Sequence, residues 1–339
     1  MGRSTVYHEL VTPIKWDEVN NKNKELMKEF IEYLRAANKS PATIKQYEAQ
    51  LKTFFVFVLE RCENKFFVDL KKREFIKYFG YLSNELEVST NRICSMRAVL
   101  SSLSNYIERI MDEEYPHFKN LIKVLEPIKK SAVREKTVLP LDEINACLEK
   151  LVADKKYQVA CAFALLASSG ARKSELVQFK ISDFDESRLI FKGVAYQSAD
   201  MRTKGAGKSG KVIPRIVFRE IVGFDKYLNL WMRQRETLGI KNEELFVVYR
   251  DGNYVPATIS TANSFARTIG TYLGKDFYCH SMRHAFTTSL LRSGFSVSTV
   301  QNIVQWQSAD LVAVYDDRSK EEAISGFMDS FVENGGEFK

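Results

Sequence analysis

Two short segments of the sequence carry basic side chains that could bind an anion together. In SSGARKSELVQF, Arg172 stands at the start of a short helix and Glu175 follows one turn later. In HSMRHAF, His280 and Arg283 are three residues apart, so on a helix they project from one face and can converge on one anion. Each pattern has a structural alternative, because Arg172 and Glu175 could form a helix-start ion pair and His280 could be a hydrogen-bonded structural histidine.

A third segment, VQWQSADLVAVYDDRS, places Trp306 nine residues before Tyr315. Aromatic residues near a C-terminal helix usually belong to a core, so this segment alone indicates little. The three segments follow one another in a fixed order, however, with a lysine-bearing stretch between the first two. Their joint presence favours one shared site more strongly than any single segment does.

This order of segments resembles the tyrosine recombinase family of phage integrases, Xer proteins and Cre. The family's G-x-R-x-x-E-L segment is met by residues 170–176, and its H-x-x-R box by His280 and Arg283. Its nucleophilic tyrosine lies nine residues after a histidine or tryptophan, as Tyr315 does after Trp306. The resemblance covers most of the chain. It implies site-specific recombination of DNA through 3′-phosphotyrosine and Holliday-junction intermediates, in the integration or excision of a phage or mobile element.

The resemblance also implies roles for the catalytic side chains. Arg172 and Arg283 would bind the phosphate, because planar guanidinium groups grip phosphate oxygens bidentately and stay charged at any working pH. Tyr315 would attack the phosphodiester, and His280 would help it lose its proton, since a phenol has a pKa near 10. One phosphoester is exchanged for another, so we expect no metal, no ATP and no other cofactor.

The remaining site residues are expected to position groups or to move a proton. Trp306 can donate one hydrogen bond but cannot titrate, and Glu175 would orient neighbouring basic side chains. The family carries its catalytic lysine, which would protonate the leaving 5′-hydroxyl, on a β-hairpin between the first arginine and the H-x-x-R box. Here the stretch MRTKGAGKSGKVIPR offers Lys204, Lys208 and Lys211. Lys204 matches best, Lys211 is second, and the choice stays open.

The elements that must position these residues begin with a helical first part. Apolar residues recur at helical spacing over 22–38, Ser40 and Pro41 begin a second helix, and further helices are expected over 72–82 and 91–111. After a leader at 1–21, we therefore expect a helical domain over 22–126, which the resemblance implies is a SAM-like core-binding domain. Periodicity then fails, and prolines and lysines indicate a linker over 127–137.

The second part is expected to hold the catalytic residues. Asp142 can cap a helix, and the nearly all-apolar run 157–170 belongs at the centre of a core. The runs RLIFK (188–192) and KVIPRIVF (211–218) predict two short strands. The sequence thus predicts a mainly α fold: a helical N-terminal domain plus an α-rich catalytic domain over 138–331 with a small antiparallel sheet, and a tail over 332–339.

Charge is compatible with an anionic partner, which the resemblance implies is double-stranded DNA. Residues 201–219 contain six basic side chains and no acidic one, a concentration suited to phosphate contacts, although a solvated loop is the alternative. By resemblance, the two domains would close as a clamp on the duplex. The expected contacts come from this loop, the linker and two N-terminal helices: Arg202, Lys208, Lys211, Lys129, Lys130, Lys45, Lys52, Arg92 and Arg97.

Composition restricts the class of protein. The chain has 339 residues, 45% hydrophobic and 27% charged, with a net charge of +7, and no window approaches the roughly 20 apolar residues that span a membrane. Five scattered cysteines favour a reduced intracellular protein. We therefore expect two soluble intracellular domains, and the resemblance implies that they lie in the cytoplasm, associated with the nucleoid of a bacterial or phage-infected cell.

The resemblance implies a homotetramer on two synapsed DNA sites. Residues 319–331 could form a helix that passes to a neighbouring subunit, or could pack in cis. Whether accessory DNA-bending proteins take part is left open. Two alternatives to a recombinase remain: a DNA-binding regulator that keeps the fold without catalysis, and a topoisomerase or telomere resolvase with the same chemistry.

Overall fold

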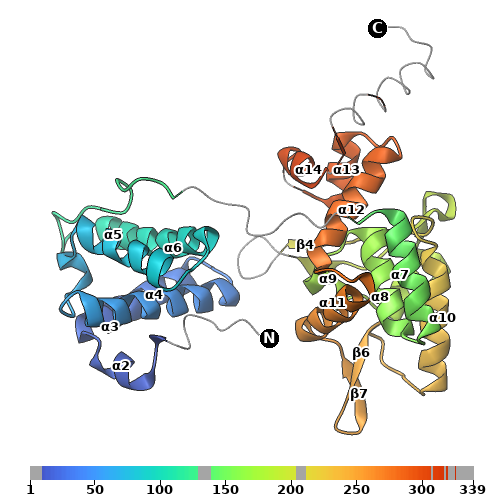
Figure 1. Ribbon diagram of the computed structural model, residues 1–339, viewed down its shortest axis with the longest axis horizontal. Helices are drawn as coiled ribbons and strands as arrows, with labels where there is room; N and C mark the ends of the chain where they lie inside the picture. Colours follow the sequence, from blue (N-terminus) through green and yellow to red (C-terminus); the bar gives the residue numbers. More distant parts are fainter. Residues whose placement is uncertain are drawn as a thin grey trace. The chain divides into compact units, whose positions relative to one another are not determined.

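The computed structural model describes residues 10–128, 139–203, 211–306, 308–316, 318, 319 and 325. Contacts among them form two compact units, one within residues 10–128 and one from residue 139 onward (Figure 1). The linker expected over 127–137 lies largely outside the described residues, and the tail over 332–339 lies wholly outside them.

The first unit is helical throughout. Its elements are α2 (Pro13–Glu18), α3 (Asn21–Ala36), α4 (Pro41–Arg61), the 3-10 turn η1 (Phe67–Asp69), α5 (Lys72–Gly80), the π-helical turn η2 (Tyr81–Glu85) and α6 (Thr90–Ile110). At the start of α4, the Thr43 amide donates to Oγ of Ser40 at 3.2 Å, and Pro41 occupies the first turn, as the sequence predicted. Helix α2 was not predicted.

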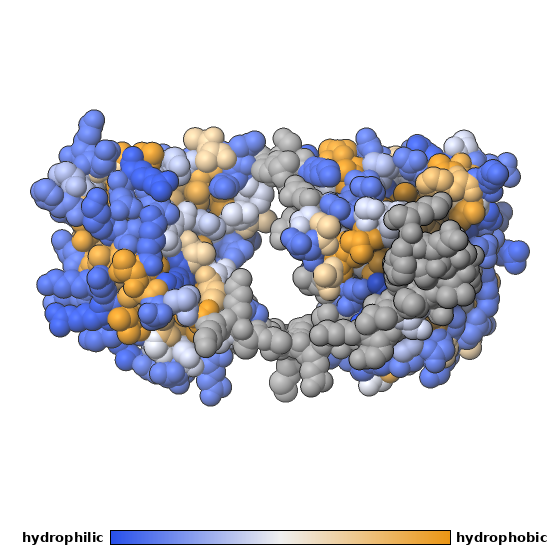
Figure 2. All heavy atoms as spheres, turned by 90° about the horizontal axis from the view of Figure 1, so that it is seen from above, coloured by the Kyte–Doolittle hydropathy of each residue, from blue (hydrophilic) through white to orange (hydrophobic). Residues whose placement is uncertain are grey.

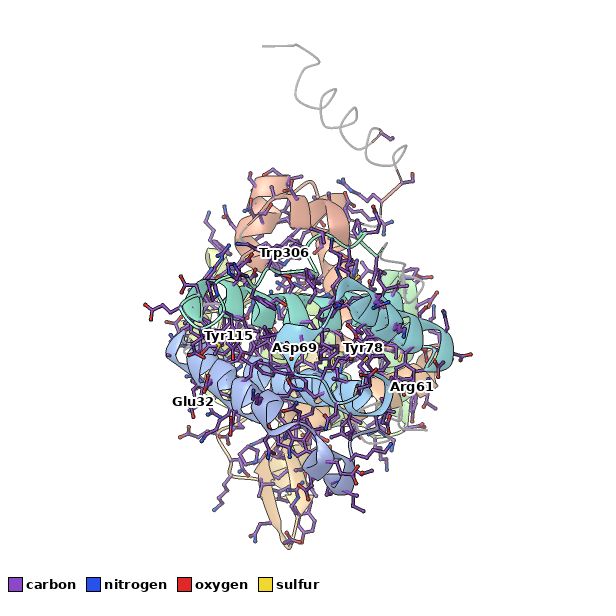
Figure 3. All side chains as sticks on the ribbon, turned by 90° about the vertical axis from the view of Figure 1, so that its left-hand side faces the viewer. Glu32, Arg61, Asp69, Tyr78, Tyr115 and Trp306 are labelled. Carbon is purple, nitrogen blue, oxygen red and sulfur yellow. The ribbon has the colours of Figure 1, made fainter. Side chains whose placement is uncertain are left out.

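Aromatic packing and one buried amide hold this unit together. Phe54 contacts the rings of Phe67, Phe75 and Tyr78, and the Tyr78 side chain is wholly buried among the helices (Figure 3). The buried Asn23 donates to the Lys65 carbonyl and accepts from the Phe67 amide, both at 2.9 Å. The unit therefore has a core of its own, as a separate domain requires.

The second unit combines helices with short antiparallel strands. Its helices are α7 (Leu141–Ala153), α8 (Tyr157–Ser169), α9 (Lys173–Leu176), α10 (Phe224–Thr237), α11 (Ile259–Leu273), α12 (Cys279–Arg292), α13 (Val297–Val304) and α14 (Asp310–Tyr315), with 3-10 turns η3 (Ile181–Phe184), η4 (Glu186–Arg188) and η5 (Phe191–Gly193). Its strands are β1 (Leu189–Ile190), β2 (Ala195–Gln197), β3 (Met201–Thr203), β4 (Lys211–Ile213), β5 (Ile216–Phe218), β6 (Val247–Arg250) and β7 (Asn253–Pro256). The predicted mainly α fold with a small antiparallel sheet is confirmed.

Helix α8 lies at the centre of this unit, as its apolar sequence predicted. Every residue from Ala160 to Ser169 is buried, against α7, α10, α11 and α12. The helix ends at Gly170, whose φ of 57° lies in the left-handed region. At the start of α7, the prediction that Asp142 caps the helix is wrong: the helix begins at Leu141, and Asp142 lies inside the first turn.

The strands differ from those predicted. The run RLIFK contributes only β1, because Phe191 and Lys192 have positive φ values and turn the chain. The run KVIPRIVF is split at Pro214, which has no N–H to donate to a ladder, so β4 pairs with β3 and β5 with β2. The result is one long, interrupted hairpin of four short strands in place of the two short strands predicted.

Polar and charged residues cover much of the face shown in Figure 2, with smaller apolar patches between them. Where the structure describes the chain, no helix combines the length and the apolar composition needed to cross a membrane.

Candidate active site

The first candidate arginine lies at the turn between α8 and α9. Arg172 is the N-cap of α9, and its Nη1 atom donates to Oε1 of Glu175 at 2.8 Å and to Oγ1 of Thr203 at 2.9 Å. Among the described residues these are the only hydrogen bonds of its guanidinium, and the side chain is 27% exposed. The other nitrogens can therefore face an incoming phosphate.

Glu175 is the buried anion that holds this arginine. Its carboxylate has no exposed surface and accepts from Arg172, from Arg215 at 2.7 Å and from the Thr203 hydroxyl. Burial alone would raise its pKa, but the charge of Arg215 and the hydrogen bonds of these neighbours outweigh burial and hold the pKa at about 2. Glu175 is therefore an ionised acceptor that orients its basic neighbours and moves no proton at neutral pH.

The second candidate arginine is on α12. Arg283 is 1% exposed, and it donates from Nη1 to the Gly170 carbonyl at 2.8 Å and from Nη2 to the Val304 carbonyl at 3.0 Å. Because Gly170 is two residues before Arg172, the two arginines lie on neighbouring segments. His280 is exposed one turn earlier. Its ring is edge-on to that of His284, with 6.0 Å between the ring centroids.

The aromatic residues follow α13. Trp306 is 7% exposed, and its ring lies 5.2 Å from the Arg283 guanidinium carbon. It also packs with Phe286, Val304 and Val312, so it is both a core residue and a neighbour of the arginine. Tyr315 is the last residue of α14, and its side chain lies outside the described residues.

Strand β3 of the hairpin reaches Glu175 through Thr203. Thr203, which contacts Glu175, is the last residue of β3 and pairs with Lys211 across the ladder. Lys204 directly follows Thr203, but Lys204 and Lys208 lie outside the described residues.

Two family models match most of this chain. The model described as the phage integrase family matches residues 137–322, and that of the N-terminal SAM-like domain of phage integrases matches residues 26–117. The chain belongs to the phage integrase family. It is a tyrosine-type site-specific DNA recombinase, as the order of its site segments predicted.

Curated relatives resemble this recombinase over most of its length. The SPbeta prophage-derived recombinase-like protein YomM of Bacillus subtilis is 29% identical over 286 residues, which are 83% of this chain and 82% of the relative. Tyrosine recombinase XerA of Pyrococcus horikoshii is 24% identical over 296 residues, which are 86% of this chain and 89% of the relative.

Two solved structures share the fold. The Tn1549 transposon integrase in complex with circular intermediate DNA superposes with a TM-score of 0.63 at 16% identity, covering 89% of this chain and 98% of that one. A lambda integrase dimer bound to a COC′ core site superposes with a TM-score of 0.63 at 16% identity, covering 88% of this chain and 96% of that one.

Some of the residues predicted to contact DNA from the N-terminal domain of the recombinase already have partners within the protein. Lys45 and Arg92 are exposed. Lys52, in contrast, pairs with Glu48 at 2.7 Å, and Arg97 donates to the carbonyls of the 122–126 turn. Arg97 thus has a structural role within its own domain.

The contacts predicted nearer the hairpin also differ in accessibility. Arg202 is exposed on β3, and Lys211 is exposed on β4. Lys129 and Lys130 lie outside the described residues. Two further cations of the basic run are used internally, since Arg215 is buried and Arg219 pairs with Asp225. Buried Arg215 therefore fits neither the phosphate contacts suggested for this run nor its alternative, a solvated loop, and Arg219 is held by an ion pair within the unit.

Sequence reasoning missed two side chains of this recombinase site, Thr203 and Arg215. The signal for Arg215 was present, since it is the one charged residue inside the apolar run VIPRIVF. A charge in the middle of a strand-like run is costly unless it is paired, which could have suggested a buried ion pair. The described residues contain no group of three or more potential metal ligands.

Proposed function

We propose that the recombinase cleaves and rejoins duplex DNA with Tyr315 as its nucleophile and with Arg172 and Arg283 as the phosphate-binding pair. The observation that carries this assignment is the convergence of both arginines on one turn: Arg283 donates to the carbonyl of Gly170, and Arg172 follows two residues later. The Trp306 ring lies 5.2 Å from the Arg283 guanidinium carbon. Three sequence segments far apart in the chain thus meet, as one reacting phosphate would require.

The chemistry follows from the residue types. Attack of the Tyr315 oxygen on phosphorus forms a 3′-phosphotyrosine bond and releases a 5′-hydroxyl; attack by a 5′-hydroxyl reverses the step. The arginines offset the charge of the transition state. His280 would accept the tyrosine proton, and a hairpin lysine, Lys204 in our assignment, would protonate the leaving oxygen. Each phosphoester replaces another of similar energy, so the reaction needs neither ATP nor a metal.

The DNA partner is proposed on the same basis. The Tn1549 and lambda integrases are bound to DNA in their solved structures, and two arginines meet at one turn here, which supports a phosphate-bearing partner. A tetramer on two synapsed sites, with residues 319–331 passed between subunits, belongs to the proposal, as does action on phage or mobile-element DNA in the cytoplasm. Those residues lie almost wholly outside the described part of the chain.

The test traps the covalent intermediate. The protein is incubated with a pool of nicked duplexes of random sequence, in which cleavage beside the nick lets the short 5′-hydroxyl strand diffuse away. Denaturing gels then reveal protein that has become covalently bound to DNA, and sequencing of that DNA identifies the site. We expect an adduct with the wild type and none with Tyr315→Phe, although both bind the site equally.

The same assay separates the alternatives. Specific binding without an adduct would contradict the enzyme assignment and favour a DNA-binding regulator. Relaxation of a supercoiled plasmid that lacks the site would favour a topoisomerase.

A further inference from the structure

Arg215 is a wholly buried cation beside the site. The side chain is 1% exposed, as a guanidinium is only when its charge is paired, and its Nη2 donates to the equally buried Glu175 at 2.7 Å. Its Nη1 donates to the Val304 carbonyl at 2.9 Å. Arg215 therefore joins the carboxylate that orients Arg172 to the end of α13.

The Val304 carbonyl is shared by two arginines. It accepts from Arg215 and, at 3.0 Å, from Arg283, whose other nitrogen donates to Gly170 at 2.8 Å. These hydrogen bonds form a closed circuit. It runs from Gly170 through Arg283, the Val304 carbonyl and Arg215 to Glu175, and the main chain between Glu175 and Gly170 closes it. This circuit ties together the α8–α9 turn, the hairpin, α12 and α13.

One member of this circuit, the Val304 carbonyl, lies just before the segment that bears the proposed nucleophile. Val304 is the last residue of α13, and a helix leaves its final carbonyls without intrahelical partners. The next residue, Gln305, adopts a left-handed φ of 58°, and its side-chain Nε2 donates to the Pro214 carbonyl at 3.3 Å. Trp306 and then α14, which ends at Tyr315, follow directly. Pro214 and Arg215 thus hold the helix end through two separate contacts.

We propose that Arg215 is a positioning residue. It fixes the position of Arg172 and Arg283 relative to the segment that carries Trp306 and Tyr315. It would act by joining Glu175 to the carbonyl end of α13. Its guanidinium is buried behind Glu175, so it does not bind the phosphate itself. This inference rests on the proposed function, since it concerns the cleavage step of that reaction.

Arg235 provides a matched control in the same unit. It is also buried, at 2% exposure, and donates to the carbonyls of Asn242, Glu244 and Leu245 while lying 5.7 Å from the Trp231 ring. None of these partners belongs to the circuit. Replacing Arg235 therefore measures what the loss of a buried arginine costs the fold alone.

The experiment measures single-turnover adduct formation over a range of concentrations of the nicked site duplex. The proteins are wild type, Arg215→Met, Arg215→Lys, Arg235→Met and Arg235→Lys, each assayed below its unfolding transition. The rate at saturating DNA reports positioning at the phosphate, and the half-saturating concentration reports binding. Because misplacement of a reacting group by about 1 Å costs about 100-fold in rate, we expect Arg215→Met to lower the saturating rate by about 100-fold.

The half-saturating DNA concentration should stay unchanged in Arg215→Met. Arg215→Lys should recover part of the rate, because an ammonium can still reach Glu175 but not both partners at once. The Arg235 variants should keep the wild-type saturating rate. A wild type that forms no adduct would refute the proposed function itself, before Arg215 is tested.

Three results would overturn the role of Arg215. One is a saturating rate in Arg215→Met no lower than that of Arg235→Met. Another is a change confined to the half-saturating concentration, which would make Arg215 a binding residue. The last is failure of both Arg215 variants to fold while the Arg235 variants fold, which would make it a folding residue.

Discussion

At the scale of single residues, Glu175 makes the acid stability of the recombinase depend on one carboxylate. Its pKa is about 2 in the folded protein, against an ordinary value of 4.5, so the unfolded state binds the proton more readily. The stabilisation is complete above the unfolded pKa and is lost as the pH falls from about 5 to about 2, amounting to roughly 3 kcal/mol.

Glu175→Gln should therefore unfold with a weaker pH dependence between pH 5 and pH 2 than the wild type, and at neutral pH it should be less stable. The loss at pH 7 should be about 3 kcal/mol or more, because Arg215 is left as an uncompensated buried charge. Denaturant unfolding at several pH values measures both effects. Glu243→Gln is the control, since this carboxylate pairs with Lys180 at the surface. Parallel pH curves for wild type and Glu175→Gln would contradict the prediction.

The identity of the proton donor is the second prediction at this scale. A lysine that protonates the leaving 5′-oxygen becomes unnecessary when that oxygen is replaced by sulfur, because a thiolate leaves without a proton. Lys204→Ala should abolish cleavage of ordinary DNA, and a 5′-bridging phosphorothiolate duplex should restore it.

Lys211→Ala is the control for this experiment, because Lys211 is exposed on β4 and pairs with Thr203 in the ladder. It should cleave ordinary DNA at close to the wild-type rate. Sulfur rescue of Lys211→Ala in place of Lys204→Ala would move the assignment to the second candidate.

At the scale of elements, the turn from α8 to α9 has little freedom to vary. A Cβ at Gly170 would lie 2.6 Å from Cδ1 of Phe286, and the φ of 57° is itself unfavourable for other residues. Gly170→Ala should destabilise the protein by more than the roughly 1 to 2 kcal/mol of the left-handed backbone alone. It should also lower the cleavage rate, because the Gly170 carbonyl holds Arg283.

Gly274→Ala separates the effect of the left-handed backbone from the effect of the clash with Phe286. Gly274 ends α11 with a φ of 68°, but a Cβ there meets nothing within 4 Å. This variant should lose stability through the backbone only and should keep full cleavage. Thermal unfolding measures the stability of Gly170→Ala and Gly274→Ala, and the adduct assay measures their cleavage rates. Equal losses of stability and of rate in the two variants would refute the role of the Phe286 contact.

The elements also show how far the sequence could predict this fold. Helix α4 was predictable because its cap and apolar periodicity are local, and the central place of α8 because its sequence is apolar nearly throughout. A hairpin was expected only by resemblance, and its strand bounds and register were not predicted, because the pairing of β3 with β4 and of β2 with β5 depends on contacts between strands and not on local periodicity. The site followed the same division: motif spacing indicated Arg172 and Arg283, whereas Arg215 acquires its role only when the hairpin meets α13.

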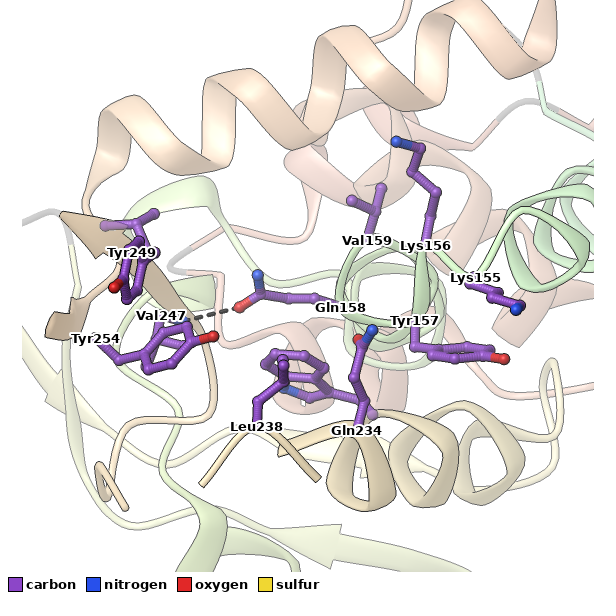
Figure 4. A pocket seen from close by; sticks show the side chains of 12 residues that line it. Lys155, Lys156, Tyr157, Gln158, Val159, Gln234, Leu238, Val247, Tyr249 and Tyr254 are labelled. Carbon is purple, nitrogen blue, oxygen red and sulfur yellow. Dashed lines mark hydrogen bonds between the residues drawn. The ribbon is translucent and has the colours of Figure 1, made fainter. Parts of the chain in front are cut away.

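The β6–β7 hairpin is a further element outside the site. A cavity of about 360 Å³ lies at its base, lined in part by Tyr249, Tyr254, Trp231 and Gln158 (Figure 4). Gln158 accepts from the Val247 amide at 2.8 Å and so fastens the hairpin to α8. None of the candidate catalytic residues lines this cavity.

At the scale of the whole molecule, the net charge of +7 is unevenly distributed. Residues 1–134 contain 23 Lys and Arg against 18 Asp and Glu, which leaves +5 in the first part and +2 in the remainder. DNA affinity should therefore depend on cations in both parts. Binding measured against salt concentration should give a steep negative slope of log K on log salt.

If Lys45 and Arg92 each make one phosphate contact, as we predict, Lys45→Ala and Arg92→Ala should each reduce the magnitude of this slope by about 1 and leave the saturating cleavage rate unchanged. Lys226→Ala is the control, because Lys226 already pairs with Glu149. An unchanged slope in both test variants would remove these two residues from the DNA interface.

The shared acceptor at the end of α13 has a consequence for mutational tolerance. Arg215 and Arg283 both donate to a main-chain oxygen, which every amino acid at position 304 supplies. The Val304 side chain is buried and contributes packing only. In a library that randomises both positions and selects for recombination, position 304 should accept several apolar residues, whereas position 215 should return almost only arginine.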